Sequence, residues 1–359
     1  MSINRVDACG YKRADDWPRV VDCIQRAVSD DNGRTWRETG PIVRSGPYES
    51  GRIQNAWMHF MDPENGALLS LFSWRTGSDK PYSMQYELSN DEGHSWTKPA
   101  SLFSNDSEFS KLSLVADQAP FAKLDDGTIV CGVNCAGNDR MSGGVAFLRG
   151  RWNAEQNGMN WEVGQTISML SGAMMKDWSL TTPEDWPLTE PDLLPLGGTR
   201  LLTTLRFCGD EKKGVCSSRQ CALSEDGGKT WSRPWTLTYD DGSPVHVPAA
   251  LAAFERHPAS GRVFWFANIL EHPVHGCDPR YPLAMAEFDT DRLCLKKKTV
   301  TAVLDLPPGA SNDTRCSNFG HYVDRENGDI ILAPGEEYYL PPNYQTDDFY
   351  AYRIRIVDV

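Results

Sequence analysis

The hydrophobic positions of this chain recur in short runs that each follow a glycine turn. Every run is rich in aliphatic and β-branched residues, which is typical of a short buried strand after a tight turn. A second apolar segment, SMQYELS, QCALS or AMAEF, follows three of the runs. The pattern predicts an all-β chain. The five runs are ENGALLSLF (64–72), DDGTIVCGV (125–133), GGTRLLTTL (197–205), SGRVFWFAN (260–268) and ENGDIILAP (326–334).

A polar motif, Ser-x-Asp-x-Gly-x-Ser/Thr-Trp, occurs at residues 29–36, 89–96 and 224–231. Its Asp can accept hydrogen bonds from the backbone of its own turn, and its Gly supplies the positive φ of a tight hairpin. Its Trp can anchor the next strand by burying the indole ring. Degraded copies stand at 157–161 and 289–291. We expect each of these Asp boxes to be a structural turn that takes no part in chemistry.

The two motifs interleave as an internal repeat. The glycines of the first two boxes, Gly33 and Gly93, are 60 residues apart (93 − 33). Several short antiparallel strands per repeat of this length are typical of a β-propeller blade. Five glycine-strand units and the N-terminal box predict a six-bladed β-propeller, although five blades are possible. Without a linker or low-complexity segment, residues 1–359 are expected to form one domain, with its ring closed by the N- and C-terminal strands.

Charge and hydropathy restrict the function further. The net charge of −13 argues against non-specific binding to nucleic acid or an anionic membrane surface. The chain contains no apolar run long enough to predict a membrane span. The polar start, MSINRVDACGYKRADDW, does not resemble a secretory signal, so we expect a cytoplasmic protein or an exported one whose leader has been removed. The sequence leaves the oligomeric state open.

Metal chemistry and cofactors are not expected. The ten cysteines show no paired C-x-x-C spacing, and they are expected to behave mostly as small buried hydrophobic residues. His272 and His275 have no further ligand at a spacing that suits zinc.

Asp boxes on a propeller resemble those of the sialidase (neuraminidase) superfamily, and residues at the strand ends extend this resemblance. RIQNA (52–56) is similar to the family's first inner strand, and TGSDKP (76–81) to the loop with its general acid. EPDLL (190–194) is similar to a later inner strand of the family that opens with a glutamate. RYPLAMA (280–286) is similar to a strand that begins with the family's third arginine. The resemblance implies catalytic residues Asp79, Glu190 and Tyr322, and substrate-binding residues Arg52, Arg75, Arg206, Arg280 and Glu336.

These implied roles make chemical sense for a terminal sialic acid or a related acidic sugar. The guanidinium groups of Arg52, Arg206 and Arg280 could clamp the sugar carboxylate through charge-assisted hydrogen bonds. Asp79 would protonate the leaving oxygen. Sialidases use a tyrosine nucleophile assisted by a glutamate, the role implied here for Glu190. Glu336 or Glu337 would orient the arginines.

The position of the nucleophile departs from the family pattern. Counting back from Gly328 places Phe319, which has no hydroxyl group, where the family has its tyrosine, and Tyr322 is the nearest alternative. If Phe319 replaces the nucleophile, a water molecule activated by Glu190 would invert the anomeric centre.

Two other functions remain open. The protein could be a glycosidase or polysaccharide lyase for another acidic sugar such as a uronate, with His321 and Tyr322 as acid and base. It could also be a non-catalytic propeller that binds a glycan or a protein, since the residue at 319 lacks the nucleophilic hydroxyl.

Overall fold

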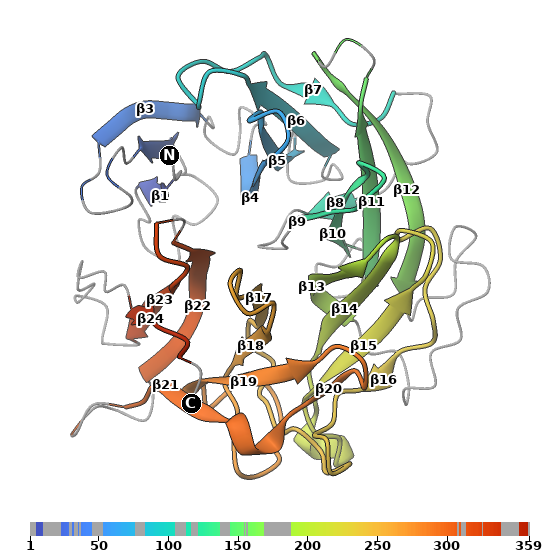
Figure 1. The fold of residues 1–359 in the computed structure, drawn as a ribbon, viewed down its shortest axis with the longest axis vertical. Coiled ribbons are helices and arrows are strands. Elements are labelled where there is room, and N and C mark those ends of the chain that lie inside the picture. The colour runs from blue at the N-terminus through green and yellow to red at the C-terminus, as the bar shows by residue number, and fades with distance from the viewer. Residues whose placement is uncertain are drawn as a thin grey trace. The chain divides into compact units, whose positions relative to one another are not determined.

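The structure, a computed structural model, is almost entirely β, as predicted. Among the described residues, the helices are two short 3-10 helices, η3 (Glu211–Lys213) and η4 (Lys297–Thr299). Figure 1 shows the strands with their labels. The chain divides into two compact units. Unit 1 comprises Met1–Trp178, Gly197–Leu201 and Ser224–Trp231, and unit 2 comprises Ser179–Leu196, Leu202–Leu223 and Ser232–Val359. The structure describes residues 5–9, 23–28, 31, 35, 37–44, 53–75, 83–104, 113–115, 121–136, 144–153, 155, 157–168, 188–306, 309, 314–324, 326–338 and 352–357.

Unit 1 contains three antiparallel sheets in chain order. The first consists of β1 (Arg5–Cys9), β2 (Cys23–Val28) and β3 (Arg37–Arg44). The second consists of β4 (Ile53–Met61), β5 (Leu68–Arg75), β6 (Ser83–Ser89) and β7 (Ala100–Ser101). The third has the order β12-β11-β10-β8, with β9 also paired to β10. Its strands are β8 (Ser113–Val115), β9 (Phe121–Lys123), β10 (Ile129–Ala136), β11 (Gly144–Trp152) and β12 (Met159–Ser168).

Unit 2 continues the same construction. One sheet consists of β13 (Leu188–Gly197), β14 (Arg200–Phe207), β15 (Ser218–Ser224) and β16 (Trp235–Thr236), and the tips of its hairpins belong to unit 1. The next has the order β17-β18-β19-β20, with β21 paired to β19. Its strands are β17 (Ala253–Arg256), β18 (Val263–Ala267), β19 (Leu283–Asp289), β20 (Cys294–Leu295) and β21 (Thr301–Leu304). The last sheet consists of β22 (Thr314–Val323), β23 (Ile330–Tyr338) and β24 (Tyr352–Ile354).

The sheets are built as propeller blades, because strands that follow each other in the chain are mostly neighbours in a sheet. The predicted fold class, an all-β propeller, is confirmed with the five-blade arrangement, the lower count that the sequence allowed. Sheets β4–β7, β8–β12, β13–β16, β17–β21 and β22–β24 are these blades, and β1–β3 form a further three-stranded sheet. A single domain closed by its terminal strands stays a prediction.

All five predicted glycine turns lead into a central strand of a blade. Gly66 is typical: its φ is 74°, its N–H donates to the carbonyl oxygen of Asp62 at 2.8 Å, and nothing surrounds the position that a Cβ would take. Backbone conformation therefore explains the glycine there, because L side chains rarely adopt this φ. The strands that follow are buried, as their continuous apolar runs predicted.

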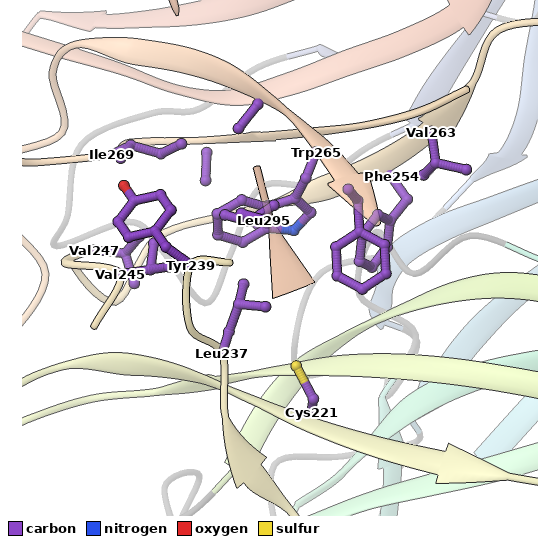
Figure 2. Packing of buried hydrophobic residues seen from close by; sticks show 14 of the residues in the cluster. Cys221, Leu237, Tyr239, Val245, Val247, Phe254, Val263, Trp265, Ile269 and Leu295 are labelled. Atoms are coloured by element: carbon purple, nitrogen blue, oxygen red, sulfur yellow. The ribbon is translucent and has the colours of Figure 1, made fainter. Parts of the chain in front are cut away.

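The core of each unit consists of these central strands. In unit 2, Trp265 of β18 is fully buried and lies among side chains of other segments, including Leu237 and Leu295 (Figure 2). In unit 1, Leu71 and Leu148 belong to a cluster of buried residues from several strands. Burial of the apolar runs holds each sheet in place, and the sheets in turn position the polar residues at the ends of their strands.

The Asp boxes are turns between neighbouring strands, as predicted. In the box between β6 and β7, Asp91 accepts hydrogen bonds from the backbone N–H of Ser95 at 2.8 Å and from its hydroxyl group. Gly93 has a φ of 86°, and its N–H donates to Ser89 Oγ at 2.8 Å. The box between β15 and β16 repeats this pattern. The aspartate in each of these two boxes is therefore held by hydrogen bonds from its own turn.

Candidate functional site

Glu190 and Arg206, two residues that the resemblance implied, form an ion pair in unit 2. Glu190 lies near the start of β13 with a positive φ of 48°, and Arg206 lies near the end of β14. Their side chains are only 19% and 21% exposed. Burial opposes the charge of Arg206, but Glu190 and two neighbouring thiols raise its pKa. Arg206 Nε is buried and has no hydrogen-bond partner within the described residues.

The turn that precedes β19 links Arg206 to two further arginines. Arg206 Nη2 donates to Cys277 Sγ at 3.3 Å, and Arg280 Nε donates to the carbonyl oxygen of Cys277 at 3.0 Å. Arg315 binds the carboxylate of Asp278 through Nε and Nη2, both at 2.8 Å. We call Arg206, Arg280 and Arg315 the arginine cluster. Residues 277–280 thus tie together three guanidinium groups that are far apart in the sequence.

Arg315 was missed by the sequence analysis. It stands at the start of β22, the first strand of its sheet, as Arg52 stands just before β4. The position of an arginine at the start of a first strand could therefore have indicated Arg315. The sequence RCSNF (315–319), however, does not resemble the family's segment in the way that RIQNA does.

A buried arginine lies next to the backbone of Glu190. Arg219 of β15 is 2% exposed and donates to the carbonyl oxygens of Glu190, at 3.4 Å, and of Ala250. Burial lowers the pKa of Arg219 to about 10, against the opposing effect of Glu190. Because a buried guanidinium needs such acceptors, Arg219 holds the backbone at Glu190 in place.

Unit 2 also contains a buried carboxylate, Asp192, near the start of β13. Asp192 is 1% exposed and accepts hydrogen bonds from the N–H groups of Leu193, at 2.9 Å, and Phe254, at 2.6 Å. Burial raises its pKa to about 7, although the charge of His321 and the two amides act in the other direction. Asp192 therefore carries a proton more readily than an ordinary aspartate.

His321 Nδ1 lies 2.9 Å from Glu255 Oε2. Burial alone would lower the pKa of His321, but the hydrogen bond to Glu255 and the charge of Asp192 raise it. The first strands of three successive sheets, β13, β17 and β22, thus contribute one charged group each to this arrangement.

The two aromatic candidates of β22 have different surroundings. Phe319 is 4% exposed and belongs to an apolar cluster with residues of β18 and β23. Tyr322 is partly buried beside Asp324 and Arg353, and burial raises its pKa. Because side chains alternate along a strand, Tyr322 faces the opposite side of β22 from His321.

The remaining predicted residues lie outside the side chains that the structure describes. Arg52 and Asp79 are outside the described residues altogether. Arg75 is the last residue of β5 and Glu336 lies in β23, and only their backbones are described. The roles implied for all four stay predictions.

Two further classes of site were searched for. In the described part of the chain, no group of three or more His, Cys, Asp or Glu residues could hold a metal ion. None of its helices has the length and apolar character that crossing a membrane requires.

Comparisons with known proteins agree on the fold. The family model described as BNR repeat-like domain matches residues 16–293. No curated protein matches this chain significantly. The structure of the Hadza microbial sialidase Hz136 is similar to this chain with a TM-score of 0.58 and 14% identity, over 87% of this chain and 56% of that one. The chain therefore spans less than two thirds of that sialidase.

Two other solved structures differ in the sugar that their descriptions mention. The intramolecular trans-sialidase from Ruminococcus gnavus, in complex with oseltamivir carboxylate, is similar with a TM-score of 0.61 and 12% identity, over 93% of this chain and 88% of that one. The α-L-arabinanase of Penicillium chrysogenum, complexed with arabinobiose, has a TM-score of 0.50 and 12% identity, over 87% of this chain and 80% of that one. Identities this low indicate a shared fold and leave the substrate to be inferred from the site.

Proposed function

The chain belongs to the BNR repeat-like family, and on that premise we propose that it is a glycosidase that releases a terminal acidic sugar of the sialic acid type. The observation that carries the proposal is the arginine cluster, in which residues 277–280 connect Arg206, Arg280 and Arg315, with Glu190 paired to Arg206. Several guanidinium groups beside one carboxylate suit a substrate that is itself an anion.

The cluster has donors to spare for a substrate carboxylate. Arg206 Nε is buried without a partner, and of the Arg280 nitrogens only Nε donates a hydrogen bond within the described residues. Two oxygens of a sugar carboxylate can accept from such nitrogens, in hydrogen bonds stronger than those between neutral groups. This arrangement favours an acidic sugar over a neutral one.

Glu190 would supply the base. Its ion pair with Arg206 and the contact between its carbonyl oxygen and Arg219 fix its position. It would take a proton from a water molecule or from a tyrosine hydroxyl, while Asp79 would protonate the leaving oxygen. In one turnover Glu190 gains one proton and Asp79 loses one, so the enzyme's total number of bound protons does not change.

Fluorogenic glycosides test the proposal. We expect release from an α-sialoside, weaker or no release from a β-glucuronide, and none from an α-L-arabinofuranoside. Glu190→Gln, which keeps the shape but cannot accept the proton, is expected to lower kcat by about 100-fold or more. Glu225→Gln removes an exposed carboxylate that is paired with Arg200, and serves as the matched control.

Other outcomes distinguish the alternatives. Release of arabinose without release of sialic acid overturns the proposal in favour of a neutral substrate. Glucuronide cleavage alone supports the uronate alternative. Tight binding of a sialic-acid-type inhibitor without turnover of any glycoside indicates a non-catalytic glycan-binding propeller.

A further inference from the structure

Two cysteines of unit 2 differ from the other described cysteines. Cys208, the residue after β14, and Cys277, in the turn before β19, are both partly exposed. The residues beside them are held together by one hydroxyl group: Gly209 N–H donates to Ser217 Oγ at 2.9 Å, and Ser217 Oγ donates to the carbonyl oxygen of Gly276 at 2.8 Å. Among the other cysteines whose side chains the structure describes, Cys216 is exposed and the rest, Cys131, Cys135, Cys221, Cys294 and Cys316, are buried. Two adjacent thiols that solvent can reach form a site at which oxidation can join them.

Cys277 contacts two arginines of the arginine cluster. Cys277 Sγ accepts a hydrogen bond from Arg206 Nη2 at 3.3 Å, and the Cys277 carbonyl oxygen accepts one from Arg280 Nε at 3.0 Å. The next residue, Asp278, holds Arg315 through two hydrogen bonds. Cys277 and the residue after it therefore contact all three guanidinium groups, so a chemical change at Cys277 can affect each of them.

We propose that Cys208 and Cys277 form a redox-sensitive modification site, in which oxidation by a hydroperoxide joins them in a disulfide and weakens the binding of an acidic sugar by the arginine cluster. The effect on sugar binding rests on the proposed function, whereas the formation of the disulfide does not.

The chemistry balances in two steps. The Cys277 sulfur attacks one oxygen of the hydroperoxide, the O–O bond breaks, and the products are a sulfenic acid and water, or an alcohol when the hydroperoxide is organic. The Cys208 sulfur then attacks the sulfenic sulfur, an S–S bond forms, and the hydroxyl group leaves as water with the Cys208 proton. The two thiols lose two electrons in total, and the hydroperoxide accepts both.

The surroundings assign an order to the two thiols. Arg206 places a cation beside Cys277 Sγ, the kind of electropositive, partly exposed environment in which cysteines react. Cys277 is therefore oxidised first, and Cys208 resolves the sulfenic acid.

The disulfide would alter the cluster in two ways. A disulfide sulfur is a poorer hydrogen-bond acceptor than the thiol sulfur that Arg206 Nη2 contacts, so the guanidinium loses a partner. The two sulfur atoms also approach to the length of a covalent bond, about 2 Å, which displaces the turn at residues 277–280. Arg280 and the Asp278–Arg315 pair move with this turn.

Mass spectrometry of the full chain tests the disulfide itself. The protein is treated with hydrogen peroxide, alkylated with iodoacetamide and digested with trypsin without reduction. Cleavage after Arg206, Lys212, Arg262 and Arg280 places the two cysteines on separate peptides, FCGDEK (207–212) and VFWFANILEHPVHGCDPR (263–280). We expect the cross-linked pair of these peptides to be the first disulfide to form, and to disappear after treatment with dithiothreitol.

Variants and a binding measurement complete the test. We expect peroxide to reduce the affinity of the parent protein for sialic acid by about tenfold, with recovery in dithiothreitol. Cys208→Ser, which cannot form the cross-link, should yield no linked peptide pair after peroxide, and the loss of affinity that dithiothreitol reverses should be smaller than in the parent. Cys216→Ser removes the exposed neighbouring thiol and should behave as the parent does.

Each remaining outcome decides one part. If both peptides remain fully alkylated at peroxide concentrations that oxidise Cys216, the modification site is wrong. If the cross-link forms and the affinity for sialic acid stays the same, the link to sugar binding is wrong. If the reduced protein binds no acidic sugar but the cross-link forms, the proposed function fails and the redox site stands.

Discussion

The Asp box at residues 224–231 and the arginine cluster both hold carboxylates in defined hydrogen bonds, but the partners come from different distances along the chain. Asp226 accepts from the N–H and hydroxyl groups of Thr230, four residues away. Glu190 pairs with Arg206, 16 residues away, and Arg206 contacts Cys277, 71 residues away.

The difference in sequence separation between the hydrogen-bond partners corresponds to a difference between a structural turn and a proposed binding site. The hydrogen bonds that the described residues donate to Asp226 come from its own turn, and although burial opposes ionisation, the bonds from Thr230 lower the pKa of Asp226. In the arginine cluster, by contrast, the buried Arg206 Nε has no hydrogen-bond partner among the described residues. A self-contained turn can be repeated as a building block, whereas a cluster with spare donors can bind something else.

The strongest test of the structural side of this comparison concerns the tryptophans of the boxes. Trp231 is 6% exposed, and its ring centroid lies 4.1 Å from that of Phe147. Trp96 is only partly buried, and its Nε1 donates to the carbonyl oxygen of Gly93 at 3.1 Å. Trp231→Ala is expected to lower the free energy of unfolding by about 4 kcal/mol, because a large buried side chain leaves a cavity.

Trp96→Ala is the matched control, and we expect it to cost about 1 kcal/mol. Urea denaturation of both variants measures the two values. Equal losses would show that burial of the ring does not distinguish the two boxes.

A smaller effect is expected from Asp192, and it sharpens the contrast with the box carboxylates. Its folded-state pKa is raised to about 7 from 3.8, so the native state binds more protons than the unfolded state between these values. The free energy of unfolding should therefore fall as the pH rises through this window, by about 1.4 kcal/mol per pH unit near pH 5 to 6.

The neighbouring His321 has a raised pKa and acts in the same direction at higher pH. Asp192→Asn, which carries no ionisable proton, should flatten the slope between about pH 4 and pH 6.5. Asp226→Asn is the control. Because the pKa of Asp226 is lowered, its stabilising contribution is lost only in acid, and the slope near pH 6 should stay as in the parent. An unchanged slope in Asp192→Asn contradicts the assignment.

The fold could be predicted from the sequence because its signals are local. Glycine turns such as Gly66, and boxes such as the one around Asp91, are defined by hydrogen bonds within about four residues, so each leaves a pattern in the sequence. The predicted BNR-repeat family and the all-β propeller fold are confirmed. The number of blades was less certain, because the N-terminal sheet has only a box to indicate it.

The site could be predicted only in part, because its contacts are distant in sequence. The resemblance pointed to Glu190 and Arg206, which lie on adjacent strands of one hairpin and form an ion pair. It missed Arg315, whose partner Asp278 is 37 residues away, and Cys277, whose role depends on Arg206. No spacing rule links such residues before the sheets are assembled.

The central claim is that the arginine cluster binds a carboxylate, and titration calorimetry tests it most directly. Sialic acid and its methyl ester, which differ only in the charge that the cluster should recognise, are titrated into the parent protein, Arg206→Gln and the exposed control Arg200→Gln. We predict that the acid binds the parent and Arg200→Gln about 100-fold more tightly than the ester does, and that Arg206→Gln removes most of this difference. Equal affinity of the parent for the acid and the ester would contradict the account.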